Sequence, residues 1–159
     1  MTTEGSYRIA VPETEYALFD TRRRDLPAVV AVNKSLVKFE PKDVFPWYLS
    51  IVIEGRDLAQ NRMPTRDENE VLTSLGDRLE RRVLSTATAE GSTNVLWLAH
   101  LTWNGRRQLL YYVHNPEPVD HALRRMLDGG PSEREWEYVM ECDPAWQSAS
   151  PFLRLCSAA

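Results

Sequence analysis

The chain has 159 residues, with 19 lysines and arginines against 23 aspartates and glutamates, and a net charge of −4 at pH 7. Hydrophobic residues make up 43% and charged residues 26%, which is typical of a globular protein and argues against intrinsic disorder. The acidic balance disfavours general nucleic-acid binding, which needs a basic surface. The length favours one domain over 1–159.

The N-terminal sequence has neither the basic start nor the apolar stretch of a secretion signal. The longest apolar runs, such as 95–99, are far shorter than the roughly 20 residues of a membrane helix. We therefore expect a cytoplasmic protein with no membrane partner. Cys142 and Cys156 do not form a Cys-x-x-Cys pair, and a reducing compartment predicts that both are free thiols.

The first 45 residues predict an extension ahead of the main fold. Residues 1–14 are polar and indicate a loose arm. Within 15–45, the β-rich runs 16–19 and 28–32 flank a charged turn, and a hairpin is the simplest interpretation. We therefore expect an N-terminal β-extension over 15–45.

A strand and a helix open the next segment. Residues 47–53 are apolar on both faces, as in a central strand. Thr65 is a suitable N-cap, and Glu68 three residues later completes a capping-box pattern. Apolar residues then recur at helical spacing up to Val83, which predicts a helix with one buried stripe.

A β-hairpin is predicted over 95–113. Asn104 and Gly105 lie at its centre, and a type I′ turn needs a positive φ at both positions. A two-residue turn would place Trp97 opposite Tyr112.

A second helix and a final strand follow. Asn115 is an N-cap, Pro116 occupies the first helical position, and Gly129 with Gly130 ends the helix. Residues 136–142 alternate between apolar and polar side chains, which indicates a half-exposed strand.

From residue 46 the expected elements follow the order β-α-β-β-α-β, the ferredoxin-like arrangement. Right-handed crossovers predict an antiparallel sheet with both helices on one face and the strand order 136–142, 47–53, 108–113, 95–103. The fold class is therefore α+β, with a ferredoxin-like core over 46–143 and a C-terminal tail over 144–159. The other face must be covered by the N-terminal hairpin, by the tail or by a partner.

No pattern predicts a catalytic, metal or cofactor site. The chain has no nucleophile elbow, P-loop or dinucleotide fingerprint. The expected register sends His100 and His114 to opposite faces, and His121 lies away from the apolar stripe of its helix. Glu137 and Glu141 lie about 13 Å apart on a strand, too far for a glycosidase acid pair. We therefore expect no metal and no cofactor, and lean against an enzyme.

Most of the net charge lies near the C-terminal end, where residues 131–159 hold two basic groups against five acidic ones. The acidic residues are Glu133, Glu135, Glu137, Glu141 and Asp143. They could solubilise an edge strand and block edge pairing. They could instead form a surface that docks a basic protein. Both readings stay open, as does a homodimer.

The aromatic residues offer an alternative. A pocket lined by Trp97, Trp103, Tyr112 and Trp146 would favour a small-molecule-binding domain or an enzyme. If the acidic residues do not bind the partner, an alternative surface is the hairpin around Trp103, Arg106 and Arg107. Arg106 and Arg107 precede a strand that has leucines where an RNA-recognition module carries aromatics, so RNA binding is disfavoured.

Two stretches carry a family resemblance. They are Trp103-Asn104-Gly105-Arg106-Arg107 with Leu110-Tyr111-Tyr112-Val113, and Asp143-Pro144-Ala145-Trp146 with Phe152-Leu153. The chain resembles the bacterial domain of unknown function family 695 over roughly 45–156. That family is similar in architecture to the regulator of ribonuclease activity B, a small acidic protein that inhibits a nuclease by binding it. The resemblance implies a non-enzymatic regulator or inhibitor, and an immunity-type role that masks a basic toxin belongs to the same class. It supplies no catalytic residues.

Overall fold

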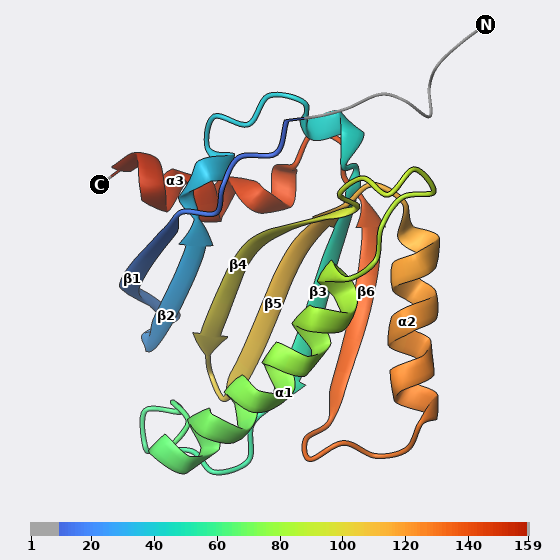
Figure 1. Ribbon diagram of the computed structural model, residues 1–159. Helices are drawn as coiled ribbons and strands as arrows, with labels where there is room; N and C mark the ends of the chain where they lie inside the picture. Colours follow the sequence, from blue (N-terminus) through green and yellow to red (C-terminus); the bar gives the residue numbers. More distant parts are fainter. Residues whose placement is uncertain (1–9, 159) are drawn as a thin grey trace, which may run out of the picture.

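The computed structural model describes residues 10–158 and shows an α+β fold, with one antiparallel six-stranded sheet and three α-helices (Figure 1). The strand order is β1-β2-β4-β5-β3-β6. The strands are β1 Tyr16–Arg23, β2 Leu26–Asn33, β3 Trp47–Glu54, β4 Val95–Trp103, β5 Arg106–Val113 and β6 Trp136–Cys142. The helices are α1 Arg66–Leu84, α2 Pro116–Asp128 and α3 Ser150–Ala158. Most of the expected loose arm, residues 1–9, lies outside the described residues.

Helix α1 begins at the predicted residue, but only half of the predicted capping box forms. The Thr65 hydroxyl accepts a hydrogen bond from the Glu68 amide at 3.3 Å. The Thr65 amide donates to the carbonyl of Asp57 at 3.0 Å instead of to the Glu68 carboxylate. The Glu68 carboxylate is buried and binds Arg134, so the prediction of a reciprocal capping box was wrong. A capping box is a local pattern, whereas this ion pair joins residues far apart in the chain.

The β4–β5 hairpin has the predicted turn but a different register. Asn104 and Gly105 have φ values of 51° and 79°, both positive as expected. Close to the turn the pairing follows the prediction, but a bulge just beyond Trp97 shifts it by one residue. Trp97 therefore lies opposite Tyr111, and the predicted pairing with Tyr112 was wrong. The bulge moves Trp97 and Tyr112 to opposite faces of the sheet.

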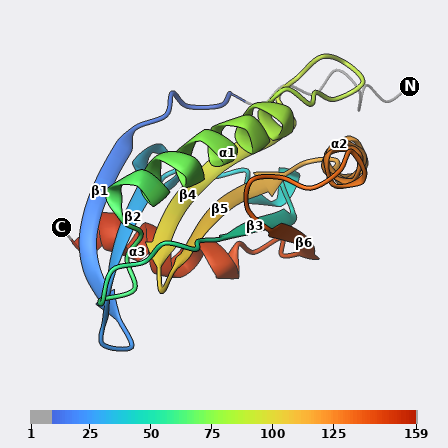
Figure 2. The ribbon, with the colours of Figure 1, turned by 90° about the horizontal axis from the view of Figure 1, so that it is seen from below.

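Two hydrophobic clusters fill the two faces of the sheet. Helices α1 and α2 cover the first face, which we call the helix face, as Figure 2 shows. The second face is covered by residues 34–45, which contain the 3₁₀ helices Lys34–Leu36 and Lys42–Val44, and by helix α3. Trp146 anchors this layer, since its buried indole donates to the carbonyl of Phe45 at 2.9 Å. The N-terminal hairpin lengthens the sheet beside β4 and covers neither face.

Helix α3 lies over only one end of the second face. It contacts β2 and the 3₁₀ helix Lys34–Leu36. Strands β3 and β6 lie at the other end of the sheet, and β6 is its edge strand (Figure 2). The incomplete layer leaves side chains of β3 and β6 exposed on the second face.

Candidate functional site

The exposed end of the second face is the candidate functional site, and we call it the β3–β6 face. Its exposed or half-buried residues surround the buried Ser50, and they are Tyr48, Val52, Glu54, Glu137, Val139 and Glu141. The register places Glu137 opposite Val52 and Val139 opposite Ser50. The alternate residues of β3, such as Ile51, are buried beneath the helices. Val139 is 53% exposed, so an apolar side chain of the edge strand lies in solvent between Glu137 and Glu141.

Three carboxylates surround these apolar side chains. Glu137 and Glu141 are exposed, and neither forms an ion pair with any described residue. Glu54 pairs with Arg106, with a distance of 3.1 Å between Nε and Oε2. Burial, followed by the nearby charges of Glu141 and Asp143, raises the pKa of the Tyr48 hydroxyl to about 12. The β3–β6 face is therefore negatively charged at neutral pH.

The structure does not gather all five predicted acidic residues on this face. Glu133 pairs with Arg78 at 2.6 Å. Asp143 accepts hydrogen bonds from the Tyr112 hydroxyl at 2.7 Å and from the amides of Gln147 and Ser148. Burial opposes ionisation of Asp143, but these hydrogen bonds outweigh it and lower the pKa of the carboxyl. The role of Asp143 is thus to hold the turn that leads to α3.

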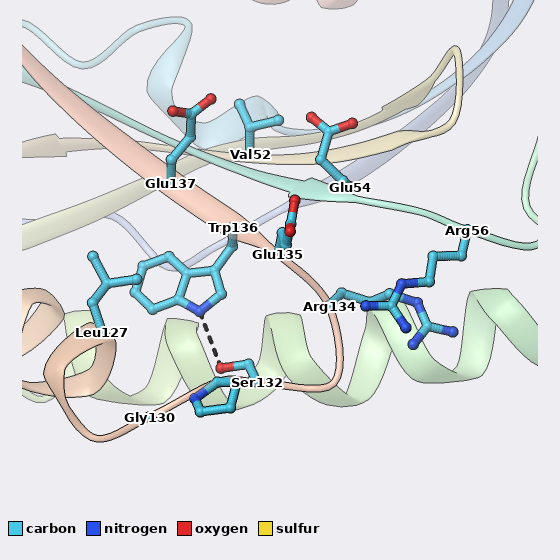
Figure 3. Close-up of a pocket in the computed structure, with 11 residues that line it drawn as sticks. Val52, Glu54, Arg56, Leu127, Gly130, Ser132, Arg134, Glu135, Trp136 and Glu137 are labelled. Carbon is cyan, nitrogen blue, oxygen red and sulfur yellow. Dashed lines mark hydrogen bonds between the residues drawn. The ribbon is translucent and has the colours of Figure 1, made fainter.

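Glu135, the remaining predicted residue, lines a hollow of about 720 Å³ beside the start of β6. Figure 3 shows Val52, Glu54 and Glu137 on one side of the strands and Trp136 on the other. The Trp136 indole donates to the Ser132 hydroxyl at 3.2 Å. The hollow therefore continues from the β3–β6 face around the sheet edge towards α2.

A buried ion pair fixes the loop that enters β6. Arg134 binds the Glu68 carboxylate through two hydrogen bonds, one of them 2.7 Å long from Nε to Oε2. The Arg56 amide donates to the same oxygen at 2.9 Å. These interactions, led by the hydrogen bond from Arg134, lower the pKa of Glu68 to about 2. Because Arg134 is bound to Glu68, it does not neutralise the carboxylates of β6.

The predicted aromatic pocket does not form. Trp97 packs beneath the helices on the helix face, whereas Tyr112 and Trp146 are buried on the second face. The Tyr112 and Trp146 rings stack with centroids 4.1 Å apart and fill the core between them. Trp103 lies at the far end of the hairpin, where its indole donates to the carbonyl of Arg23 at 2.9 Å. These aromatic side chains are therefore spread over both faces of the sheet and do not line one pocket.

The alternative surface around Trp103, Arg106 and Arg107 does not form, because neighbouring residues of a strand point to opposite faces of the sheet. Arg106 lies on the second face beside Glu54. Arg107 lies on the helix face, where its guanidinium donates to the Thr73 hydroxyl at 3.3 Å. Trp103, opposite Arg106, packs with the second-face cluster. Trp103, Arg106 and Arg107 therefore do not form one surface.

The histidines lie apart, as the sequence indicates. The His100 ring reaches Glu80 at 2.9 Å on the helix face, whereas His114 donates to the Val44 carbonyl at 2.6 Å on the second face. Within residues 10–158, no three His, Cys, Asp or Glu side chains are close enough to hold a metal ion. No helix in that range is long and apolar enough to cross a membrane. Cys142 and Cys156 are free thiols.

Sequence reasoning did not identify a polar cluster beneath α1. Glu80 accepts a hydrogen bond from the Tyr111 hydroxyl at 2.7 Å and also contacts His100. Burial opposes ionisation of Glu80, but these hydrogen bonds prevail and lower its pKa. Helical spacing places Glu80 beside the apolar stripe of α1, but only the tertiary structure supplies its partners.

The fold and this surface define an α+β protein with a single sheet, one end of which is exposed and acidic. The family of unknown function DUF695 matches residues 17–153, and the chain belongs to that family. No curated protein sequence and no solved structure matches the chain significantly.

Proposed function

We propose that this protein is a non-enzymatic regulator or inhibitor that binds a basic protein through the β3–β6 face. One observation carries the proposal: the exposed Val139 lies on the edge strand between the carboxylates of Glu137 and Glu141, which form no ion pair with a described residue. An apolar centre with a polar rim is the usual anatomy of a protein interface. The carboxylates would speed association with a basic surface and select against an acidic one.

The same charges argue against other occupants. A second copy of the chain would bring Glu137 and Glu141 against carboxylates of the same sign, which costs free energy. A nucleic acid would be repelled by the same groups. An enzyme that acts on an anionic substrate carries a basic surface, so a nuclease or a toxin of that kind fits the proposal.

We also assign residues 46–143 to a ferredoxin-like core and place the protein in the cytoplasm. The element order from β3 to β6, with α1 and α2 on one face, supports the ferredoxin-like assignment. The resemblance of the sequence to the regulator of ribonuclease activity B supports a binding role by analogy of fold.

The test is a charge reversal, Glu137→Lys with Glu141→Lys. The matched control is Glu13→Lys with Glu90→Lys, two exposed glutamates that form no ion pair with a described residue. Each tagged variant is used to capture proteins from the native cell, and the captured partner is then purified and titrated directly.

We expect the β6 variant to keep its circular dichroism spectrum and to bind the purified partner at least tenfold more weakly, about 1.4 kcal/mol. The control variant should bind as the wild type does, and added salt should weaken wild-type binding. If the folded β6 variant binds the partner as tightly as the control, the acidic residues only keep an edge strand soluble, and the proposal is wrong.

A further inference from the structure

A second cavity lies on the opposite face of the sheet and does not involve the β3–β6 face. It has a volume of about 520 Å³ and lies between the start of α1 and strands β2, β4 and β5. We call it the α1 groove. Its volume lies within the range of small-molecule sites, roughly 300–1,000 Å³. Figure 1 shows α1 beginning near the lower ends of β4 and β5 and crossing the sheet diagonally from there.

The walls of the α1 groove are chemically divided. Val29 and Met63 belong to an apolar wall, whereas Arg66, His100, Thr102 and Arg107 supply hydrogen-bond donors. Such a combination of apolar wall and convergent polar groups is typical of a ligand site. None of the residues that line the groove is an aspartate or a glutamate.

Arg107 is the most important residue of the groove because no carboxylate of a described residue pairs with its guanidinium. The side chain is half-buried, and its guanidinium donates only to neutral partners, the Thr73 hydroxyl and the Asn69 side-chain oxygen. Its Nε is buried and has no hydrogen-bond partner among the described residues. Burial lowers the pKa of Arg107, and the charge of Asp77 offsets only part of this effect. A partly buried cation without a bound anion is costly, so binding an anion here would reduce that cost.

The other charged groups leave the α1 groove positive. Arg66 is exposed and forms no ion pair with a described residue. Glu80 is the nearest acid to His100, and its carboxylate is already bound by His100 and Tyr111. The cationic groups that remain to meet a ligand are therefore Arg66 and Arg107.

We propose that the α1 groove binds a small organic carboxylate, with the carboxylate at Arg107 and a short apolar group against Val29 and Met63. A guanidinium is suited to a planar carboxylate, and the hydrogen bond is strengthened by the charges. The apolar wall gives no partner to a second anionic group, which disfavours a dicarboxylate, and inorganic phosphate has no apolar part to cover Val29 and Met63, so a monocarboxylate with a short alkyl group fits best. This site is independent of the proposed protein-binding function.

The test uses hexanoate as the probe, with hexan-1-ol and inorganic phosphate for comparison. Binding to the wild type is followed by the NMR resonance of the Arg107 Nε–H group, which has no hydrogen-bond partner among the described residues. In every variant, Arg107→Gln included, the Kd is taken from the backbone amide resonances of His100 and Thr102, which line the groove. The matched control is Arg106→Gln, because Arg106 is adjacent in sequence, carries the same charge and lies on the other face. Arg107→Gln removes the guanidinium that we propose binds the carboxylate. Arg66→Gln removes the second cation of the groove at an exposed position, where the substitution should have little effect on folding.

We expect hexanoate to shift the Arg107 resonance in a saturable way, and hexan-1-ol to leave it unchanged. Arg107→Gln should raise the Kd for hexanoate at least tenfold, Arg66→Gln should raise it less, and Arg106→Gln should not change it. If Arg106→Gln and Arg66→Gln weaken hexanoate binding equally and the Arg107 resonance does not shift, hexanoate is held only by general charge attraction, and the proposal is wrong. Tighter binding of phosphate than of hexanoate would overturn the carboxylate assignment.

Discussion

The β3–β6 face and the α1 groove lie on opposite faces of one sheet and have opposite charge. Arg106 and Arg107 show how this arises, since adjacent residues of a strand point to opposite faces. Arg106 meets Glu54 on the second face, whereas Arg107 meets only neutral groups beneath α1. The comparison teaches that the local charge of each face depends on which arginines find a carboxylate within the fold, more than on the net charge of the chain.

The largest expected effect comes from breaking the Arg134–Glu68 pair, which holds the loop beside the β3–β6 face. Arg134→Ala leaves the Glu68 carboxylate buried without its cation, and we expect a loss of about 3–5 kcal/mol in the free energy of unfolding. Arg106→Ala, which breaks the exposed pair with Glu54, should cost about 1 kcal/mol or less. Urea unfolding measures both. Equal losses would mean that burial does not distinguish the two pairs.

Lowering the pH should remove the stabilisation that the Arg134–Glu68 pair provides, over a defined pH range. The pKa of Glu68 is about 2 in the folded protein, below its ordinary value of 4.5, so the unfolded chain takes up the proton first. The contribution of the pair is therefore fully present above about pH 4.5, and about 3 kcal/mol is lost as the pH falls towards 2. Because other carboxylates also titrate there, the measurement is the difference between wild type and Glu68→Gln in unfolding experiments at pH 6 and pH 3. A difference that does not change with pH would contradict this interpretation.

The β4–β5 turn positions Arg106 and Arg107, and Gly105→Val should strain it. Gly105 has a φ of 79°, which a β-branched residue rarely adopts. A Cβ atom there would also lie 2.7 Å from Cδ1 of Leu58. We expect a loss of about 1–3 kcal/mol, seen as a lower melting temperature. An unchanged melting temperature would show that the turn type is wrong.

The smallest expected effect sharpens the comparison between two arginines. Arg134 is bound to a buried carboxylate, whereas Arg107 has none. We expect Arg107→Gln to change the free energy of unfolding by less than about 1 kcal/mol, because it removes an unmatched charge as well as hydrogen bonds to neutral groups. Urea unfolding without added anions tests this. A loss as large as that of Arg134→Ala would assign Arg107 to the core and not to a ligand site.

The candidate sites were only partly predictable. Strand alternation correctly placed Glu137 and Glu141 on one exposed face, but their role in docking a partner stays a prediction. The hydrogen bond from Tyr112 to Asp143 could not be read from the sequence, because the two residues meet only when β5, β3 and β6 pair side by side in the sheet. The unmatched charge of Arg107 was also hidden, since the sequence does not show which carboxylates lie within reach.

The sequence by itself determined the elements whose signals are local. Thr65 and Asn115 cap the two long helices, and Asn104 with Gly105 sets the hairpin turn, because each acts on backbone groups within a few residues. Only the tertiary structure decided the bulge beyond Trp97, the partner of Glu68 and the extent of α3 over the second face. Each of these depends on packing between residues far apart in the chain, where the free energy comes from burial that no local pattern encodes.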